Sequence, residues 1–412
     1  MLLTPPACRH CAAPMPTVFL DLGHAPPSNA YLAPAARNAP EVTFPLRLRL
    51  CESCWLVQTE DFTRSDHLFD AEYAYFSSTS QGWLDHAARY AAEMTARFGL
   101  GAGAHVIEVA CNDGYLLRNF VAAGVPCLGI EPTASTASVA ESLGIPVMRA
   151  FFDEAMGHRL AQTDRAADLI VGNNVYAHVP DINGFTKGLA AALKPQGVIT
   201  LEFPHLMRLV ESCQFDTVYH EHFSYLSLGT VMRLFKAAGL RVFDVQELPT
   251  HGGSLRVFGC HADATHVESA APGAVLAEEL HRGMASTTFY AGFQARAEAV
   301  KDGLLRFLLD AKSDGKSVAA YGAAAKGNTI LNFAGVKPDL LPFVCDAAPS
   351  KQGKLMPGSH IPILSPDLLR TRRPEYLLIL PWNIASEVRD QLADLAAQGT
   401  RFVTVVPEVR VG

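Results

Sequence analysis

The chain has 412 residues, of which 49% are hydrophobic, and a formal net charge of −7. This length predicts a globular protein of roughly two to three domains. The negative charge and the lack of a long lysine or arginine run argue against a nucleic-acid partner. No apolar run is long enough to span a membrane, and the first residues lack the basic flank and apolar core of a signal peptide. We therefore expect a cytoplasmic protein with neither a membrane nor a nucleic acid as partner.

Four of the nine cysteines are clustered near the N-terminus. They form two Cys-x-x-Cys pairs, made by Cys8, Cys11, Cys51 and Cys54. Two such pairs can offer four thiolates to one tetrahedral zinc ion, whereas a redox dithiol would need only one pair. The missing signal sequence disfavours disulfides, and a chance occurrence of both pairs is the remaining alternative. We expect a structural zinc ion that stabilises a small proline-rich module over residues 1–67.

A second domain is expected over residues 68–261. It begins with an amphipathic helix at residues 81–98, in which Trp83, Tyr90 and Met94 recur at helical spacing. Short apolar strands then alternate with helical sequence, and they are predicted at residues 105–110, 126–131, 167–173 and 197–202. Strand and helix in alternation predict an α/β fold with a doubly wound parallel sheet.

The ends of the first two strands of this sheet carry the signal for a cofactor. A turn at residues 111–114 follows the first strand, and Glu131 ends the second. These two places meet in a doubly wound sheet, so we expect Glu131 to hold a ribose. NAD is the rival cofactor, but the turn lacks the Gly-x-Gly-x-x-Gly that a pyrophosphate requires. Asp113 in the turn suits a cofactor with an amino-acid end, which favours S-adenosylmethionine; purely structural acids are the alternative.

Proton-transfer groups are concentrated between residues 215 and 227. Tyr219, His220, Glu221 and His222 are consecutive, and aromatic residues on both sides predict a partly buried place. In an extended chain, Tyr219 and Glu221 would point one way and the two histidines the other, unless the strand ends there. A site that needs an acid, a base and an orienting carboxylate could be built here, whereas the alternative is a polar surface loop. The zinc-protease pattern His-Glu-x-x-His does not fit.

A third domain is expected over residues 262–412. A long helix is predicted at residues 275–311, followed by a strand at 317–321, a small-residue turn at 322–327 and a helix at 328–334. Two more strands are predicted at residues 341–346 and 376–380. Backbone amides at a helix start favour phosphate, and Lys326 adds positive charge, so we expect a nucleotide site here. A purely structural role for this part is the alternative.

Six motifs, in this order, resemble those of the bacterial sugar C-methyltransferases that act on nucleotide-linked 4-keto-deoxysugars. They are the four cysteines and residues 73–78, 108–114, 172–178, 219–222 and 321–327. The resemblance covers nearly the whole chain. It implies an N-terminal zinc module, a central class I S-adenosylmethionine-dependent methyltransferase domain and a C-terminal Rossmann-like domain that binds the nucleotide sugar.

The resemblance also implies roles for individual residues. His222 is then the catalytic base, in a pocket lined by Tyr219, Glu221, Asn174 and His178. Asn174 and His178 would share a face if Asn174 opened a helical turn. The residues expected around the cofactor are Gln81, Glu108, Cys111, Asn112, Asp113, Gly114, Glu131, Pro132 and Asn173. Those expected around the sugar are Tyr73, Tyr75, Ser77, Lys326, Asn328 and Lys351.

The expected reaction moves a methyl group from S-adenosylmethionine to carbon, most simply to C3 beside a C4 ketone. A proton on that carbon is acidic because the ketone oxygen can take the charge as an enolate, so a base is required. The rivals are an NAD-dependent sugar epimerase and a non-catalytic subunit that binds a nucleotide sugar. We expect the partner to be a nucleotide-diphosphate sugar and the protein to be a monomer.

Overall fold

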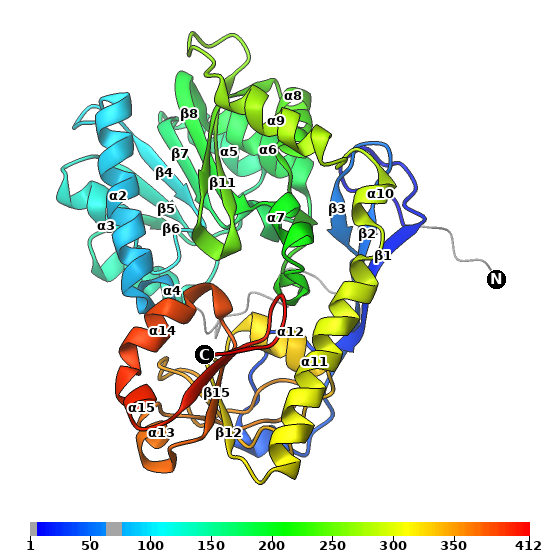
Figure 1. Ribbon diagram of the computed structural model, residues 1–412. Coiled ribbons are helices and arrows are strands. Elements are labelled where there is room, and N and C mark those ends of the chain that lie inside the picture. The colour runs from blue at the N-terminus through cyan, green and yellow to red at the C-terminus, as the bar shows by residue number, and fades with distance from the viewer. Residues whose placement is uncertain (1–5, 63–75) are drawn as a thin grey trace.

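The computed structural model describes residues 6–62 and 76–412, which form three β-sheets (Figure 1). The predicted sugar contacts Tyr73 and Tyr75 lie outside these described residues. The N-terminal sheet has the strand order β1-β2-β3-β9 and is antiparallel throughout. Its strands are β1 (Thr17–Ala25), β2 (Phe44–Leu50), β3 (Val57–Thr59) and β9 (Ser224–Tyr225), with the short helix η1 (Pro34–Ala36) between the first two. Because β9 follows the expected catalytic segment, this segment is tied directly to the N-terminal sheet.

The central sheet has seven strands in the order β10-β11-β8-β7-β4-β5-β6. The strands are β4 (Val106–Val109), β5 (Cys127–Ile130), β6 (Val147–Met148), β7 (Ala167–Asn173), β8 (Leu193–Pro204), β10 (Leu240–Leu248) and β11 (Ser254–His261). β4 to β8 run parallel, and β11 lies antiparallel between β8 and β10. The predicted doubly wound sheet is confirmed. β10 and β11, which form the antiparallel edge, were not predicted from the sequence.

Helices cover both faces of the central sheet, as the predicted fold class requires (Figure 1). One face carries α2 (Gln81–Phe98), whose bounds are those predicted, and α3 (Leu117–Ala122); Tyr90 and Met94 of α2 are buried there. The other face carries α5 (Glu154–Gln162), α6 (Ile182–Ala192) and α8 (Leu228–Ala237). The remaining helices of this domain are α4 (Ala134–Ser142) and α7 (Leu206–Glu211).

The C-terminal sheet has the order β14-β13-β12-β15-β16-β17. Its strands are β12 (Val318–Tyr321), β13 (Val344–Cys345), β14 (Ile363–Leu364), β15 (Tyr376–Ile379), β16 (Arg401–Thr404) and β17 (Arg410–Val411). Only the last strand is antiparallel. The helices are α9 (Ala271–His281), α10 (Thr287–Tyr290), α11 (Phe293–Ser313), α12 (Ala325–Phe333), α13 (Asp367–Arg372), α14 (Ala385–Gln391) and α15 (Ala393–Ala397). The parallel sheet and its helices agree with the expected Rossmann-like domain.

Two predicted elements of this region are wrong. The long helix at 275–311 is three helices, because Gly283 and Gly292 adopt φ values of 86° and 75°, which end one helix and precede the next. The small-residue turn predicted to reach residue 327 ends sooner, since α12 begins at Ala325. Lys326 therefore lies in the first turn of a helix rather than in a loop.

The three sheets share cores rather than standing apart. One core joins β1 and β2, the central helix α7, the long helix α11 and the strands of the C-terminal sheet. In Figure 1, α11 runs beside β1, and α7 lies where the upper and lower halves of the molecule meet. Among residues 6–62 and 76–412, no helix combines the length and the apolar character that crossing a bilayer requires. The boundaries at residues 67 and 261 stay a prediction.

Candidate functional site

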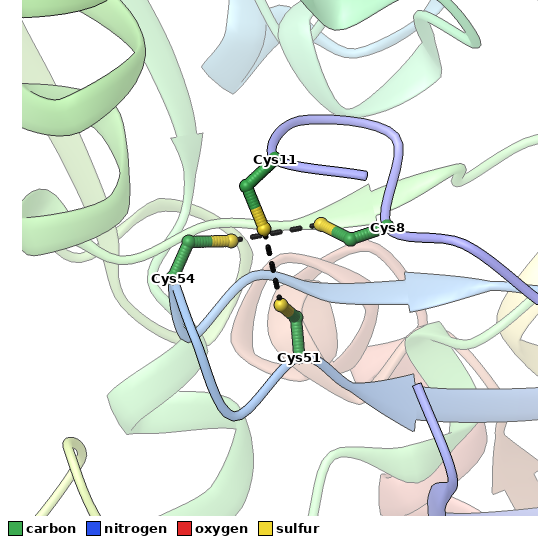
Figure 2. A group of neighbouring side chains, drawn as sticks. All are labelled: Cys8, Cys11, Cys51 and Cys54. Atoms are coloured by element: carbon green, nitrogen blue, oxygen red, sulfur yellow. Dashed lines mark hydrogen bonds between the residues drawn. The ribbon is translucent and has the colours of Figure 1, made fainter. Parts of the chain in front are cut away.

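The four N-terminal cysteines come together as predicted (Figure 2). Their sulfur atoms all lie within 4.8 Å of one another, with 3.6 Å between Cys8 and Cys54 and 3.5 Å between Cys11 and Cys51. Four thiolates about 2.3 Å from a tetrahedral zinc ion would be about 3.8 Å apart, so the cluster has the size that zinc needs. A hydrogen bond from Cys54 lowers the pKa of Cys8 to about 4. The donor set leaves no open coordination position, which makes the metal site structural.

Both cysteine pairs lie on the same kind of turn. Ala12 and Trp55 each follow a pair, adopt φ values of 60° and 63°, and donate their N–H to the carbonyl of the first cysteine, at 2.9 Å and 2.8 Å. The module is fixed to the central domain, because Arg233 on α8 donates to the Cys54 carbonyl at 2.7 Å. Loss of a metal ion from this cluster would therefore loosen a contact with the central domain as well as the module itself.

The turn after β4 and the acid after β5 meet as predicted. Glu131 is buried and accepts hydrogen bonds from the backbone N–H of Asn112 and of Thr133, both at 2.9 Å. Burial raises the pKa of its carboxyl group. These two bonds fix the turn against the second strand and orient the carboxylate.

Several buried polar atoms around this turn have no hydrogen-bond partner among the described residues. They are Glu108 Oε2, Asp113 Oδ1 and both side-chain polar atoms of Asn173. Burial raises the pKa of Glu108 well above its usual range, with further contributions from the nearby Asp113 and Glu131. Unpaired buried polar atoms are costly, so their gathering at the ends of β4 and β7 marks a place for a polar ligand. An amino-acid end and a ribose fit this donor and acceptor set.

The segment before α2 closes over the same turn. The backbone N–H of Ser77 in η2 (Ser77–Thr79) donates to Asn112 Oδ1 at 2.9 Å, and that of Ser78 donates to Asp113 Oδ2 at 3.0 Å. Gly114 has a φ of 78°, and a side chain there would lie 2.5 Å from Ile145. The turn thus needs glycine for both its backbone and its packing.

The expected catalytic segment is a turn rather than an extended strand. The N–H of His222 donates to the carbonyl of Tyr219 at 3.0 Å, and the two rings lie 4.0 Å apart. Tyr219 and His222 are therefore on the same side, contrary to the predicted alternation, because the turn folds the chain back before β9. The ring of His178 from η3 (Tyr176–His178) meets His222 edge-on at 4.5 Å.

Both imidazoles of this group are anchored by one nitrogen. His222 Nδ1 lies 3.0 Å from the Thr217 carbonyl, and His178 Nδ1 lies 2.8 Å from the Glu221 carbonyl. A carbonyl can only accept, so in each ring Nδ1 carries the proton and the lone pair of the neutral ring is on Nε2. Burial lowers the pKa of His178 to about 4 and that of His222 well below its usual value. Both rings are thus neutral proton acceptors at pH 7.

The other two members of the run face the N-terminal module. Glu221 Oε1 accepts a hydrogen bond from Asn29 at 3.2 Å, and burial raises the pKa of Glu221. His220 Nε2 lies 3.2 Å from the Pro45 carbonyl, and its ring packs edge-on against Phe44. His220 therefore holds the turn to the sheet, while Glu221 joins the site to the module.

A cavity of about 10 Å³ lies beside His222 and is lined by Thr217 and Tyr225 among others. It has room for about one water molecule.

The three C-terminal residues expected to bind the sugar lie in two places. Two of them lie beside the N-terminal module: Asn328 donates to the Ser28 carbonyl at 2.6 Å, and Lys351 lies 5.4 Å from the ring centre of Tyr31 while donating to the Ala323 carbonyl at 2.9 Å. Lys326 instead bonds Asn383 at 2.9 Å within the C-terminal domain. Burial lowers the pKa of Lys326 to about 8, and the negative charge of Asp216 partly opposes that shift. This negative charge disfavours the phosphate contact expected at Lys326.

Comparisons with known proteins match this three-part arrangement. Family models match residues 8–69 ("Putative zinc binding domain"), 83–245 ("Methyltransferase domain") and 249–407 ("C-methyltransferase C-terminal domain"). The C-methyltransferase NovU of Streptomyces niveus is 36% identical over 98% of this chain and 96% of its own. The chain belongs to the C-methyltransferase family.

Solved structures align with about half of this C-methyltransferase. The 1,6-didemethyltoxoflavin-N1-methyltransferase of Burkholderia thailandensis has a TM-score of 0.38 and 18% identity, over 50% of this chain and 95% of that one. The magnesium protoporphyrin IX methyltransferase of Synechocystis PCC 6803 has a TM-score of 0.34 and 15% identity, over 44% and 80%. The family, the cysteine cluster and the turn geometry together establish an S-adenosylmethionine-dependent C-methyltransferase with a structural zinc site.

Not every residue predicted to bind the cofactor of this C-methyltransferase has a side chain available to it. Cys111 is fully buried with its sulfur against Gly129, where a side chain would lie 2.4 Å from it, so only its backbone is available to a cofactor. Gln81 is exposed at the start of α2 and bonds Asp85 at 2.8 Å. Pro132 is half-buried beside Glu131.

The predicted helical pairing of Asn174 and His178 is wrong. Asn174 has a φ of 55° and precedes the short helix that holds His178, so it opens no helical turn. Its Nδ2 lies 3.3 Å from Nε2 of His251, a residue that sequence reasoning missed. His251 has a φ of 54° in η5 (Thr250–Gly252), between β10 and β11, and its ring lies 5.3 Å from Trp83. The usable signal was a histidine directly before two glycines, because that composition favours a strained turn.

Proposed function

We propose that this C-methyltransferase methylates C3 of a nucleotide-linked 4-keto-deoxysugar through an enolate and works as a monomer. The observation that carries the proposal is the anchored ring of His222, whose Nδ1 donates to the Thr217 carbonyl and whose Nε2 keeps its lone pair. A neutral imidazole fixed in one tautomer suits a general base. The resemblance to enzymes of ketosugars supplies the substrate class.

In the proposed reaction, His222 Nε2 takes the C3 proton. The electron pair of the C3–H bond becomes the C3=C4 double bond of the enolate, and the π electrons of the C4 ketone move to its oxygen. Methylation of carbon needs such a nucleophile, and only a neighbouring carbonyl makes the C–H acidic enough. Tyr219 flanks His222, and its hydroxyl is the candidate hydrogen-bond donor to the enolate oxygen. His178 packs edge-on against His222 and keeps its Nδ1 proton on the Glu221 carbonyl, so its role is to position the base. Glu221 and Asn29 fix the turn from its other side.

The ligand-binding residues divide between the two halves of the site. S-adenosylmethionine supplies an electrophilic methyl group on a sulfonium when it is bound. Glu131 would hold its ribose, and the unpaired atoms of Glu108, Asp113 and Asn173 would hold its polar ends. Asn328 and Lys351 would bind the nucleotide sugar near the N-terminal module, and Ser77 would contact it beside the cofactor turn.

Deuterium wash-in tests the proposal without methyl transfer. The enzyme is incubated in D2O, without methyl donor, with dTDP- and UDP-linked 4-keto-6-deoxyglucose, and proton NMR follows the C3 and C5 hydrogens, which both flank the C4 ketone. We expect enzyme-dependent loss of the C3 signal and retention of the C5 signal. Exchange at C5 alone would contradict the position, and no exchange above the enzyme-free rate with either sugar would contradict the enolate.

A further inference from the structure

We infer that Lys326 acts on the reacting end of the substrate, as the cation that stabilises the enolate oxygen, and that Asp216, which binds the same Trp382 as the lysine, balances its charge. The inference rests on the proposed function and goes beyond it, because it gives the C-terminal domain a part in the chemistry. Three sets of contacts carry it: those of the lysine, those of the turn that holds Asp216, and those between this turn and His222.

The contacts of Lys326 fix its ammonium beside Trp382, whose indole in turn binds Asp216 of the central domain. Lys326 is the second residue of α12, and its Nζ donates to Asn383 Oδ1 at 2.9 Å. The same Nζ lies 4.6 Å from the ring centre of Trp382, in the geometry of a cation–π contact. Trp382 and Asn383 belong to η6 (Trp382–Ile384), so the C-terminal domain itself holds the lysine in position.

Asp216 approaches the same point from the central domain. Asp216 is 1% exposed and lies in η4 (Phe215–Thr217), where its Oδ2 accepts a hydrogen bond from the Trp382 indole at 2.7 Å. Its Oδ1 is buried and has no hydrogen-bond partner among residues 6–62 and 76–412. Burial raises the pKa of Asp216 to about 6, and the charge of Lys326 opposes that rise. Asp216 therefore balances a nearby cation while keeping one oxygen unpaired.

The same turn also fixes the base. Thr217 follows Asp216, and its carbonyl anchors His222 Nδ1 at 3.0 Å. The next carbonyl, of Val218, accepts a hydrogen bond from Thr329 of α12 at 2.8 Å. Three consecutive residues thus connect to Trp382, His222 and α12, which sets the distance between lysine and base. The positive charge of Lys326 accordingly contributes to the lowered pKa of both His222 and His251.

A cation at this place suits an enolate better than a diphosphate. Asp216 beside the lysine would repel the two negative charges of a diphosphate that is present throughout the reaction. An enolate carries one negative charge, and it develops only as the base removes the proton. Stabilising that charge speeds proton removal without tightening ground-state binding, because the interaction strengthens only as the charge forms.

The test compares Lys326→Met and Lys326→Arg with the wild-type enzyme in the C3 wash-in assay and in steady-state methyl transfer with the same two sugars. Lys312→Met is the matched control, since Lys312 is an exposed lysine of the same domain that forms a surface ion pair with Asp339. We expect Lys326→Met to lower both the wash-in rate and kcat on the order of 100-fold with little change in KM. Lys326→Arg should restore part of this loss, and Lys312→Met should behave as wild type.

The outcomes separate this inference from the proposed function. Wild-type exchange that Lys326→Met leaves unchanged, or a raised KM with the wild-type kcat, would overturn the inference and leave the proposed function standing. No exchange by the wild-type enzyme would overturn both. Thermal unfolding and S-adenosylmethionine binding of each variant show whether it is folded, and Lys326→Gln replaces Lys326→Met if that variant does not fold.

Discussion

The cofactor turn and the base pocket are built in different ways. The cofactor turn lies within one domain, where one stretch after β4 meets one acid after β5 and two backbone hydrogen bonds join them. The base pocket draws on all three domains: Asn29 from the N-terminal module, His222 from the central domain, and Trp382 with Lys326 from the C-terminal domain. A local site can keep its geometry when domains shift, whereas an assembled one depends on every contact between them.

Removal of the zinc ion should have the largest effect and should separate the two sites. A structural zinc contributes apparent binding free energy of roughly 10 to 16 kcal/mol to a small module, so chelation or Cys8→Ser should unfold the N-terminal module. Asn29 would then leave Glu221, and C3 exchange should fall, whereas calorimetry should still detect S-adenosylmethionine binding. Equal loss of exchange and cofactor binding would contradict the difference drawn between the sites. Cys127→Ser is the matched control, because Cys127 is outside the cluster.

Gly252→Ala should damage the assembled pocket. Gly252 has a φ of 85°, and a side chain there would lie 2.4 Å from Trp382 and 2.6 Å from Gln214. The strained backbone and the overpacking together should cost roughly 3 kcal/mol of unfolding free energy. Chemical denaturation measures this loss. Gly273→Ala is the control, because no atom lies within 4 Å of a side chain built there. Equal unfolding free energies of the two variants would contradict the close approach between Trp382 and the turn that joins β10 to β11.

Glu131→Ala should damage the local site alone. The variant loses the carboxylate that would bind the ribose and the two hydrogen bonds that orient the turn. We expect weaker S-adenosylmethionine binding by about 2 kcal/mol, the scale of a hydrogen bond to a charged group. Calorimetry measures the affinity, and C3 exchange without cofactor should stay close to wild type. Unchanged affinity would refute the ribose assignment.

The smallest expected effect is that of pH on the base. A base acts when it is unprotonated, and burial depresses the pKa of His222, so exchange should not fall as the pH drops from 8 to 7, a range that also stays above the pKa of about 6 of Asp216. Above about pH 8, Lys326 loses its proton and exchange should decline, since its pKa is lowered to about 8. Lys326→Arg should extend the plateau upward. A loss of exchange between pH 8 and 6 that persists in Asp216→Asn would contradict a depressed pKa of the base.

The same comparison explains how much the sequence could predict. The bounds of α2 and β7 were correct because each buries a periodic or continuous apolar run, which sequence records directly. The meeting of Glu131 with the turn at residues 111–114 followed from the topology of a doubly wound sheet. The turn at Tyr219–His222 was missed because contacts with β3 and η3, distant in sequence, decide it.

The position of Lys326 shows a further limit. A lysine near a helix start indicated that an anionic ligand binds there. The surroundings of Lys326 could not be predicted, because Trp382, which it contacts, and Asp216, which binds Trp382, come from segments far apart in the chain. Helix α12 starts three residues earlier than predicted, because small residues at a strand end do not distinguish a turn from the first turn of a helix. His251 was missed for a related reason, since its contact with Asn174 depends on how β7 and the β10–β11 turn pack.

The central claim, that His222 is the base that forms the enolate, is tested most directly by C3 wash-in with His222→Asn beside His220→Asn. The two histidines flank Glu221, but only His222 has its ring anchored to Thr217, whereas His220 bonds the N-terminal sheet. We predict that His222→Asn still binds S-adenosylmethionine and loses exchange by roughly 100-fold to 10,000-fold, the range for a general base, while His220→Asn keeps it. Exchange near the wild-type rate in a folded His222→Asn variant would contradict the account.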